Sequence, residues 1–188
     1  MTAEYGMLPR STHTRIKREK SQSGGRTQEI SRLVGRSLRS CVDLKLLGEK
    51  QITIDCDVIN ADGGTRTAAV TGGFVALAFA LKKLKDLSEI KSIPLKHYVS
   101  AVSVGLAEES GLVTPILDLN YEEDSDISTD MNFVMTDKND FIEIQGTAED
   151  GTFSKQQLLD MMSLAEHGCQ QLFAEQEKMI GSFFPLKR

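Results

Sequence analysis

This 188-residue sequence lacks the features that mark several large protein classes. It has three cysteines, Cys41, Cys56 and Cys169, whose odd number and wide spacing exclude both a disulfide framework and a CxxC metal site. We interpret them as reduced core residues. The longest nearly apolar run, residues 74–81, is too short to cross a bilayer, and the N-terminus has no signal-peptide run. The sequence therefore predicts a cytoplasmic protein with no membrane partner.

Charge is unevenly distributed along the chain. Residues 1–40 contain nine Lys or Arg and three Asp or Glu, whereas residues 101–188 contain five Lys or Arg and seventeen Asp or Glu. The net charge of −5 therefore combines a basic N-terminal part with an acidic C-terminal part. Such polarity indicates an anionic partner at one end of the molecule.

Hydrophobic periodicity predicts the order helix, strand, helix, four strands, helix after an extended or loop segment over residues 1–26. The predicted helices cover 28–42, 67–85 and 154–180, with Ser154 as the N-cap of the last, and the predicted strands cover 52–58, 98–106, 112–119, 131–137 and 141–146. Because the strands are grouped and hairpin-like, the order favours a layered α+β sandwich over a doubly wound sheet. With 40% hydrophobic and 26% charged residues, the composition is that of one ordinary soluble domain.

A glycine-rich turn, residues 62–67, stands between a predicted strand and a predicted helix. Its glycines allow close approach of a ligand, and the first N–H groups of a helix point outward and attract an oxyanion. Arg66 can add a bidentate contact to phosphate, and Thr65 and Thr67 can donate hydrogen bonds. The alternative is a simple tight turn in which a threonine caps the helix.

The N-terminal segment carries a dense set of basic residues: Arg10, Arg15, Lys17, Arg18, Lys20 and Arg26. This density suits the backbone of RNA or DNA. The alternative is a flexible segment that only adds solubility. The glycines at 24 and 25 lead into a predicted helix and again resemble an anion site.

A third candidate is the acidic stretch over residues 118–126, at the end of an apolar strand. Clustered carboxylates can hold a hard divalent cation or act as general acids, and they perturb one another's pKa. A solvated acidic loop explains the same residues. Because no zinc motif and no Ser-His-Asp signature is readable, magnesium-assisted phosphate chemistry is the class that the residues favour.

Three motifs, at residues 2–12, 24–30 and 55–67, together resemble the ribonuclease PH family. The resemblance continues over residues 118–132 and 143–148 and so spans nearly the whole sequence. It implies a layered β/α sandwich with mixed sheets and packed helices. It also implies a phosphate-dependent 3′-to-5′ exoribonuclease that trims tRNA precursors, releases nucleoside diphosphates and assembles as a homo-hexameric ring.

The resemblance assigns phosphate binding to Arg26 in the GGRT motif and to Gly64, Thr65 and Arg66 in the glycine-rich turn. These are the anion-site candidates named above. Inorganic phosphate is then the co-substrate, and Mg²⁺ is the expected cofactor.

The family's acidic pair, in a D-x-x-Y-x-x-D pattern, falls on Asp118 and Asp124, which we expect to act in catalysis and to hold Mg²⁺. The arginines that grip RNA in the family fall on Arg10, Arg15 and Arg18. The sequence does not divide the roles between the two aspartates.

Family members carry several strands before the T-A-E-Y motif, where this sequence has Met1. We therefore expect residues 1–188 to be an N-terminally truncated ribonuclease PH domain with an exposed sheet edge and an uncovered apolar face. A catalytically silent or truncated RNA-binding ring subunit is the main alternative, although the retained arginine and acidic pair favour the enzyme. A small-molecule phosphotransferase is a weaker alternative because the sequence has no P-loop lysine and no dinucleotide fingerprint.

Overall fold

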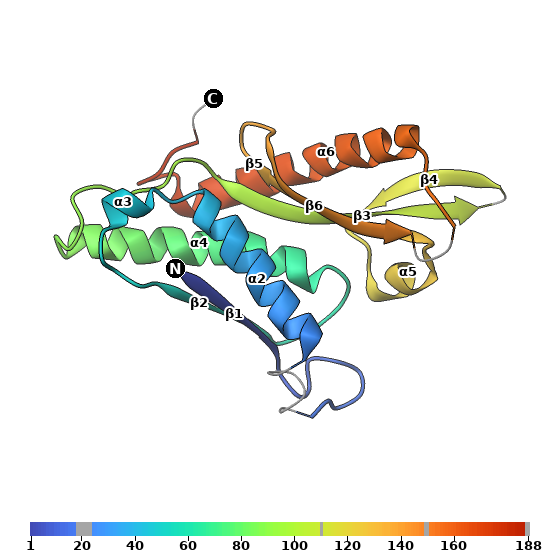
Figure 1. Cartoon of the computed structure of the whole chain (residues 1–188), viewed down its shortest axis with the longest axis horizontal. Coiled ribbons are helices and arrows are strands. Elements are labelled where there is room, and N and C mark those ends of the chain that lie inside the picture. Colours follow the sequence, from blue (N-terminus) through green and yellow to red (C-terminus); the bar gives the residue numbers. More distant parts are fainter. Residues whose placement is uncertain (18–23, 110, 149–150, 187–188) are drawn as a thin grey trace.

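The computed structural model describes residues 1–17, 24–109, 111–148 and 151–186 (Figure 1). Its strands are β1 (Thr2–Met7), β2 (Thr53–Val58), β3 (Val99–Glu109), β4 (Leu112–Leu117), β5 (Thr129–Thr136) and β6 (Phe141–Ala148). Its helices are α2 (Gly25–Ser40), α3 (Leu44–Leu47), α4 (Thr65–Asp86), α5 (Tyr121–Asp126) and α6 (Lys155–Ile180).

Two sheets organise these elements. Strands β1 and β2 form a parallel pair, and an antiparallel sheet has the spatial order β4-β3-β5-β6. Helix α2 packs on β1, and α4 packs on β2 from one side and on β3 from the other, so α4 lies between the two sheets (Figure 1). Helix α6 covers β3 and β4. This is the layered α+β architecture that the sequence predicts.

Helix α4 is the central element of the core. Its 22 residues and its mean hydropathy of 1.4 in the most apolar window are sufficient, by length and composition, to cross a membrane. In the fold, however, Val70, Phe74, Leu77 and Leu81 have no exposed surface. Burial of such side chains contributes roughly 1.5–3 kcal/mol each, so these contacts hold α4 inside the protein.

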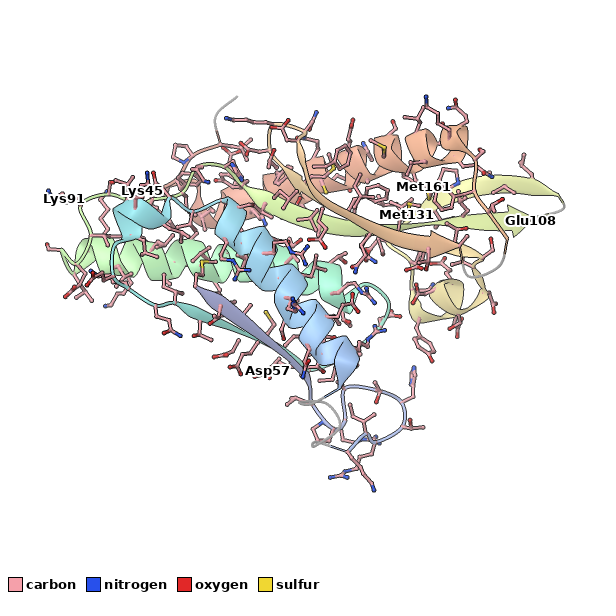
Figure 2. All side chains as sticks on the ribbon, in the orientation of Figure 1. Lys45, Asp57, Lys91, Glu108, Met131 and Met161 are labelled. Atoms are coloured by element: carbon pink, nitrogen blue, oxygen red, sulfur yellow. The ribbon has the colours of Figure 1, made fainter. Side chains whose placement is uncertain are left out.

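Side chains divide clearly between the interior and the periphery (Figure 2). Met161 of α6 has no exposed surface and Met131 of β5 is 3% exposed, and both belong to one hydrophobic core. Lys45, Lys91 and Glu108 project from the outside of the molecule (Figure 2). A single core thus joins both sheets and the three long helices.

Residues 2–7, within the segment expected to be extended or a loop, form the strand β1, which is missing from the predicted order of elements. The segment contains glycine, alanine and glutamate, which are weak strand formers, so residue propensities alone do not predict this strand. Pairing with β2 creates it: Tyr5 lies opposite Cys56 and is only 5% exposed. The strand therefore depends on pairing with β2 as well as on its own short alternation of residues.

The acidic stretch is also not simply a loop, because it contains the short helix α5. Asn120 caps this helix by accepting a hydrogen bond from the Glu123 N–H at 2.9 Å, and the Glu123 carboxylate accepts from the Asn120 N–H at 2.9 Å. This reciprocal arrangement is a capping box. The sequence carried that signal in its N-x-x-E spacing.

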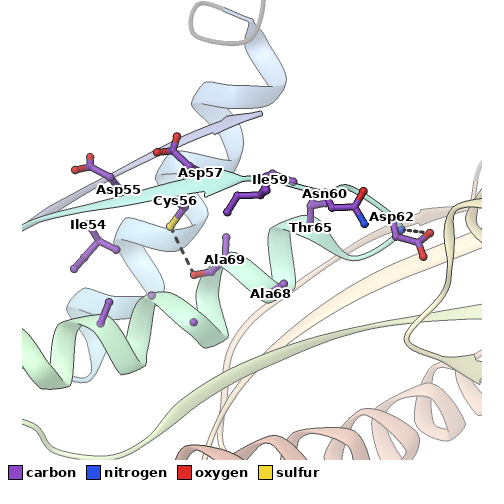
Figure 3. Close-up of a pocket in the computed structure, with 15 residues that line it drawn as sticks. Ile54, Asp55, Cys56, Asp57, Ile59, Asn60, Asp62, Thr65, Ala68 and Ala69 are labelled. Atoms are coloured by element: carbon purple, nitrogen blue, oxygen red, sulfur yellow. Dashed lines mark hydrogen bonds between the residues drawn. The ribbon is translucent and has the colours of Figure 1, made fainter. Parts of the chain in front are cut away.

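A groove of about 530 Å³ runs along β2, on the side away from β1 (Figure 3). Cys56 points across it, with its Sγ 3.8 Å from the Ala69 carbonyl oxygen, while Asp55 and Asp57 point away (Figure 3). Ile59, at its end, is 76% exposed. Within the described residues β2 pairs only with β1, so an open sheet edge and an apolar face border this groove. That residues 1–188 form one N-terminally truncated domain remains a prediction.

Candidate active site

Candidate residues from distant parts of the sequence meet in a second cavity of about 360 Å³. It lies between the start of α2, the start of α4, helix α5 and the face of the antiparallel sheet. Arg26, Gly64, Thr65, Arg66 and Asp124 all line it. In contrast to the groove beside β2, its exposed lining is mostly polar.

Two helix N-termini open on this cavity, and neither is capped by a side chain. Gly24 is the N-cap of α2 and Gly64 is the N-cap of α4, and neither helix has an acidic residue in its first turn. Gly64 has φ 68°, in the left-handed region that glycine adopts most readily. Uncapped N–H groups carry partial positive charge. With Arg26 and Arg66 alongside, the geometry suits a small oxyanion.

Hydrogen bonds hold Arg66 in place. Its Nη1 lies 3.1 Å from Oε1 of Glu29, and the Nε2 of Gln145 donates to the same oxygen at 3.0 Å. The Arg66 side chain is 20% exposed. Residues from α2, α4 and β6 therefore form one network that fixes the direction of the Arg66 guanidinium, a candidate phosphate-binding group.

The glycine-rich turn is fixed from three sides. Oδ1 of Asp62 accepts hydrogen bonds from the Tyr121 N–H at 2.7 Å and from the Gly63 N–H at 2.8 Å, and these two bonds hold the pKa of Asp62 below its ordinary value. The Tyr5 hydroxyl donates to Oγ1 of Thr65 at 2.8 Å. A Cβ on Gly63 would lie 1.9 Å from the carbonyl oxygen of Leu119, so only glycine fits between the turn and the residues that lead into α5.

The two candidate catalytic aspartates line neighbouring cavities that both include Gly64. Asp124 lines the polar cavity, whereas Asp118 lines a neighbouring cavity together with Gly64. Oδ1 of Asp118 is 3.5 Å from the point where a Cβ on Gly64 would stand, and Oγ of Ser103, which lines the polar cavity, is 3.7 Å from the same point, so Asp118 and Ser103 approach the turn from the same side. Asp118 has φ 57°, a left-handed conformation that aspartate tolerates better than most residues.

Exposure does not separate this pair from the other carboxylates of the acidic stretch. Asp118, Asp124, Glu122, Glu123 and Asp126 are all exposed, because α5 lies on the surface and none of its residues is buried. Exposure is therefore not a useful criterion for identifying the carboxylates that act in the site. Position in the cavity is the useful one, since of these five only Asp124 lines it.

The arrangement of donors limits how a metal could bind. Within the described ranges no group of three or more His, Cys, Asp or Glu side chains is placed to hold an ion. Asp130 lines the same cavity as Asp124, and sequence reasoning missed it. The chain thus offers one or two carboxylates to an ion here, a number that Mg²⁺ accepts when phosphate and water oxygens complete its shell.

The basic loop, residues 8–17 after β1, lies beside the same turn. A cavity of about 490 Å³ between residues 12–16 and the turn shares Arg26, Gly64, Thr65 and Asp124 with the polar cavity. Its loop side includes His13. The loop is tied to the turn by the Ala61 N–H, which donates to the Ser11 carbonyl at 2.7 Å.

Arg10 and Arg15 are exposed on this loop and line neither cavity. Arg18 lies outside the described residues. The structure therefore places two of the three RNA-binding candidates on the loop beside the site and outside both cavities.

The floor of the polar cavity contains residues that sequence reasoning missed. Ser103, Asn132 and Gln145 stand opposite one another on β3, β5 and β6 and line the cavity. Only the strand register brings them together, and the sequence offered no signal for it beyond the predicted strands.

Comparison with known proteins agrees with this geometry. The profile of the 3′ exoribonuclease family matches with its domain 1 over residues 1–82 and with its domain 2 over residues 97–168. These segments hold both helix N-termini, the glycine-rich turn and the acidic stretch. The chain therefore belongs to the 3′ exoribonuclease family.

Individual relatives carry the name ribonuclease PH. The protein of Bdellovibrio bacteriovorus is 68% identical over 186 residues, which cover 99% of this chain and 75% of the relative. The protein of Bacillus cytotoxicus is 52% identical over 183 residues, covering 96% of this chain and 74% of the relative. This chain thus matches about three quarters of the length of these relatives.

The crystal structure of rice (Oryza sativa) Rrp46 is similar to this chain, with a TM-score of 0.68 and 21% sequence identity. The match covers 96% of this chain and 72% of Rrp46. At this identity the similarity concerns the fold, and it confirms the predicted ribonuclease PH type of α+β sandwich.

Proposed function

We propose that this protein is a phosphate-dependent 3′-to-5′ exoribonuclease that trims the 3′ ends of RNA, tRNA precursors among them. One observation carries the proposal: Arg26 and Arg66, far apart in the sequence, meet at two uncapped helix N-termini beside Asp124. The names of the relatives support the same reaction class.

In the proposed reaction, an oxygen of inorganic phosphate attacks the phosphorus of the last phosphodiester bond. A new P–O–P bond forms, the bond to the 3′ oxygen of the preceding nucleotide breaks, and that oxygen takes up a proton. The products are a nucleoside diphosphate and an RNA shorter by one nucleotide. Arg26, Arg66 and the N–H groups at Gly64 and Thr65 hold the phosphate and offset the negative charge that accumulates in the transition state.

In this proposal the carboxylates act on the leaving group, which is the 3′ oxygen of the preceding nucleotide. Asp124 lies in the cavity and can assist proton transfer to the 3′ oxygen. A Mg²⁺ ion would be held by Asp124, with Asp118 as the second candidate ligand. When bound, the ion would neutralise charge on the phosphate oxygens.

The basic loop provides the RNA contacts in this proposal. Arg10 and Arg15, with Arg18, would bind phosphates of the RNA body, while the terminal nucleotide enters the cavity. We further propose that the protein works in the cytoplasm as a homo-oligomeric ring of six subunits, in which several basic loops can hold one RNA.

The proposal is tested by the identity of the product. A tRNA precursor with extra 3′ nucleotides is incubated with the protein, with and without inorganic phosphate, and the released nucleotides are separated by chromatography. We expect nucleoside diphosphates in the presence of phosphate only. Release of nucleoside monophosphates without phosphate would identify a hydrolytic nuclease and overturn the proposal.

An Asp124→Asn variant separates the chemical role of the carboxylate from a binding role. We expect it to bind RNA with unchanged affinity and to lose turnover, since the amide keeps the shape and loses the charge. Asp126→Asn, which changes a neighbouring exposed carboxylate outside the cavity, is the matched control. Equal loss of RNA binding and turnover in Asp124→Asn would contradict the assignment.

A further inference from the structure

The helix that carries Asp124 into the polar cavity has little packing of its own. None of the six residues of α5 is buried, and helices this short are marginal in water without outside support. Its first residue, Tyr121, is tied to the glycine-rich turn because its N–H donates to Asp62 at 2.7 Å. Asp124 lies in the second half of the helix, so its position depends also on what holds the end of α5.

Two apolar side chains flank α5, one just before it and one just after it. Leu119 precedes the N-cap residue and is 2% exposed, and Ile127 follows Asp126 and is 8% exposed. Within the described part of the chain, neither belongs to the hydrophobic core that joins the two sheets. Their burial therefore comes from a separate contact.

That contact is with Gly105 of β3. A Cβ on Gly105 would lie 2.4 Å from Cδ1 of Ile127 and 2.8 Å from Cδ1 of Leu119, far closer than two carbon atoms normally approach. The missing side chain of this glycine thus makes room for both residues that flank α5. We call Gly105, Leu119 and Ile127 the α5 anchor.

The α5 anchor lies at the wall of the polar cavity. Gly105 is paired with Asp130 of β5, and directly opposed residues of antiparallel strands project from the same face of the sheet. Asp130 lines the polar cavity, and Ile127 lines it as well. Because Asp124 precedes Ile127 by only three residues, the seat of Ile127 on Gly105 limits where the Asp124 carboxylate can lie.

We propose that the α5 anchor positions Asp124 for the reaction, with Ile127 as a positioning residue that acts through Asp124. This inference rests on the proposed function, which gives the Asp124 carboxylate its part in proton transfer. A catalytic group displaced by about 1 Å can lose about 100-fold in rate, so the contact that fixes a short surface helix can determine turnover. The role is separate from phosphate binding, since Arg26 and Arg66 are held on α2 and α4.

The first experiment separates turnover from binding. Ile127→Ala removes the Cδ1 atom that lies against Gly105, and we expect kcat to fall about 10- to 100-fold. The KM for phosphate and the affinity for RNA should change by less than about twofold. Ile127→Leu keeps the volume of the side chain and should keep most of the wild-type kcat. Gly105→Ala displaces Ile127 from the other side of the contact and should lower kcat in the same way.

A second measurement reports the order of α5 without any substrate. The Asp124 N–H donates to the Asn120 carbonyl at 2.9 Å, and the Glu123 N–H donates to Oδ1 of Asn120 at 2.9 Å. In Ile127→Ala we expect these two amide protons to exchange with solvent about tenfold faster than in the wild type. The amide protons of β3 and β5 should keep their wild-type exchange rates.

Ile90→Ala is the matched control, because Ile90 is 7% exposed, belongs to the hydrophobic core and does not line the polar cavity. The same truncation there should lower the urea midpoint of unfolding more than Ile127→Ala does, since it leaves a void in the core. It should leave kcat and the exchange of the α5 amide protons unchanged. A purely structural role for Ile127 would instead give both variants the same pattern.

The outcomes separate this inference from the proposed function. If Ile127→Ala leaves the exchange of α5 unchanged, or speeds it without lowering kcat, the anchor does not position Asp124 and only the inference fails. A rise in the KM for phosphate as large as the fall in kcat would also overturn it. If the wild type releases no nucleoside diphosphate in the presence of phosphate, the proposed function fails, and the role of Asp124 fails with it.

Discussion

Removal of the Arg66 guanidinium is expected to weaken phosphate binding with little effect on the fold. The side chain is 20% exposed and is held by Glu29 at 3.1 Å, so it is already directed when phosphate arrives. A charge-assisted hydrogen bond in such a site contributes about 1.5–3 kcal/mol, which corresponds to about a 10- to 150-fold change in affinity. We therefore expect Arg66→Ala to raise the KM for phosphate by about that factor.

Stability should change far less than phosphate binding. The Glu29 side chain left behind is 41% exposed and regains water, so losing this pair should cost below about 1 kcal/mol. The assay is the initial rate of nucleoside diphosphate release against phosphate concentration at saturating RNA, with RNA affinity and thermal unfolding measured separately.

Arg36→Ala is the control for this prediction. Arg36 lies on α2, pairs with Glu143 at 3.3 Å, is 59% exposed and does not line the polar cavity. Its loss removes the same charge without touching the proposed site, so the KM for phosphate should not change. An unchanged KM in Arg66→Ala would refute the reasoning, and so would an equal rise in both variants.

Three further predictions follow from the packing and the pKa directions. Gly63→Ala should lower stability by about 2 kcal/mol or more and abolish activity, because its Cβ would overlap backbone atoms, whereas Gly72→Ala has open space and should be neutral or stabilising in urea unfolding. Burial holds the pKa of His97 below its ordinary value of 6.5, so the unfolded chain binds this proton more readily. Stability should fall as the pH drops through 6.5 and below, and His97→Gln should show a smaller drop in urea midpoint between pH 7 and pH 5. Burial raises the pKa of Cys41 to about 12, so a thiol reagent at neutral pH should label the half-buried Cys56 first. Equal labelling rates in the folded protein would contradict the burial of Cys41.

Much of the fold could be predicted because its long elements carry their own signals. The predicted N-cap Ser154 is confirmed: its Oγ accepts from the Gln157 N–H at 3.2 Å, and the helix that follows runs from Lys155 to Ile180. Helix α2 begins at Gly25, three residues before the predicted start, because apolar periodicity begins only at Ile30. Elements with a strong local pattern are therefore predicted well, with errors at their ends.

Elements that depend on distant partners could not be predicted in the same way. Strand β1 depends on its pairing with β2, because the alternation of Ala3, Tyr5 and Met7 with less apolar residues is only six residues long and includes weak strand formers. Ser103, Asn132 and Gln145 lie side by side because of the strand register, and a shift by one residue would turn these side chains to the other face of the sheet. Sequence motifs identified the phosphate turn and the acidic stretch as candidates. The residues on the sheet face beneath them could be identified only from the structure.

The most direct test of the central claim is a crystal structure of this protein with inorganic phosphate bound. We expect one phosphate in the polar cavity, with its oxygens within hydrogen-bond distance of the Arg26 and Arg66 guanidinium groups and of the Thr65 N–H. Phosphate bound only at the exposed Arg10 and Arg15, with the cavity between the two helix N-termini left empty, would contradict it.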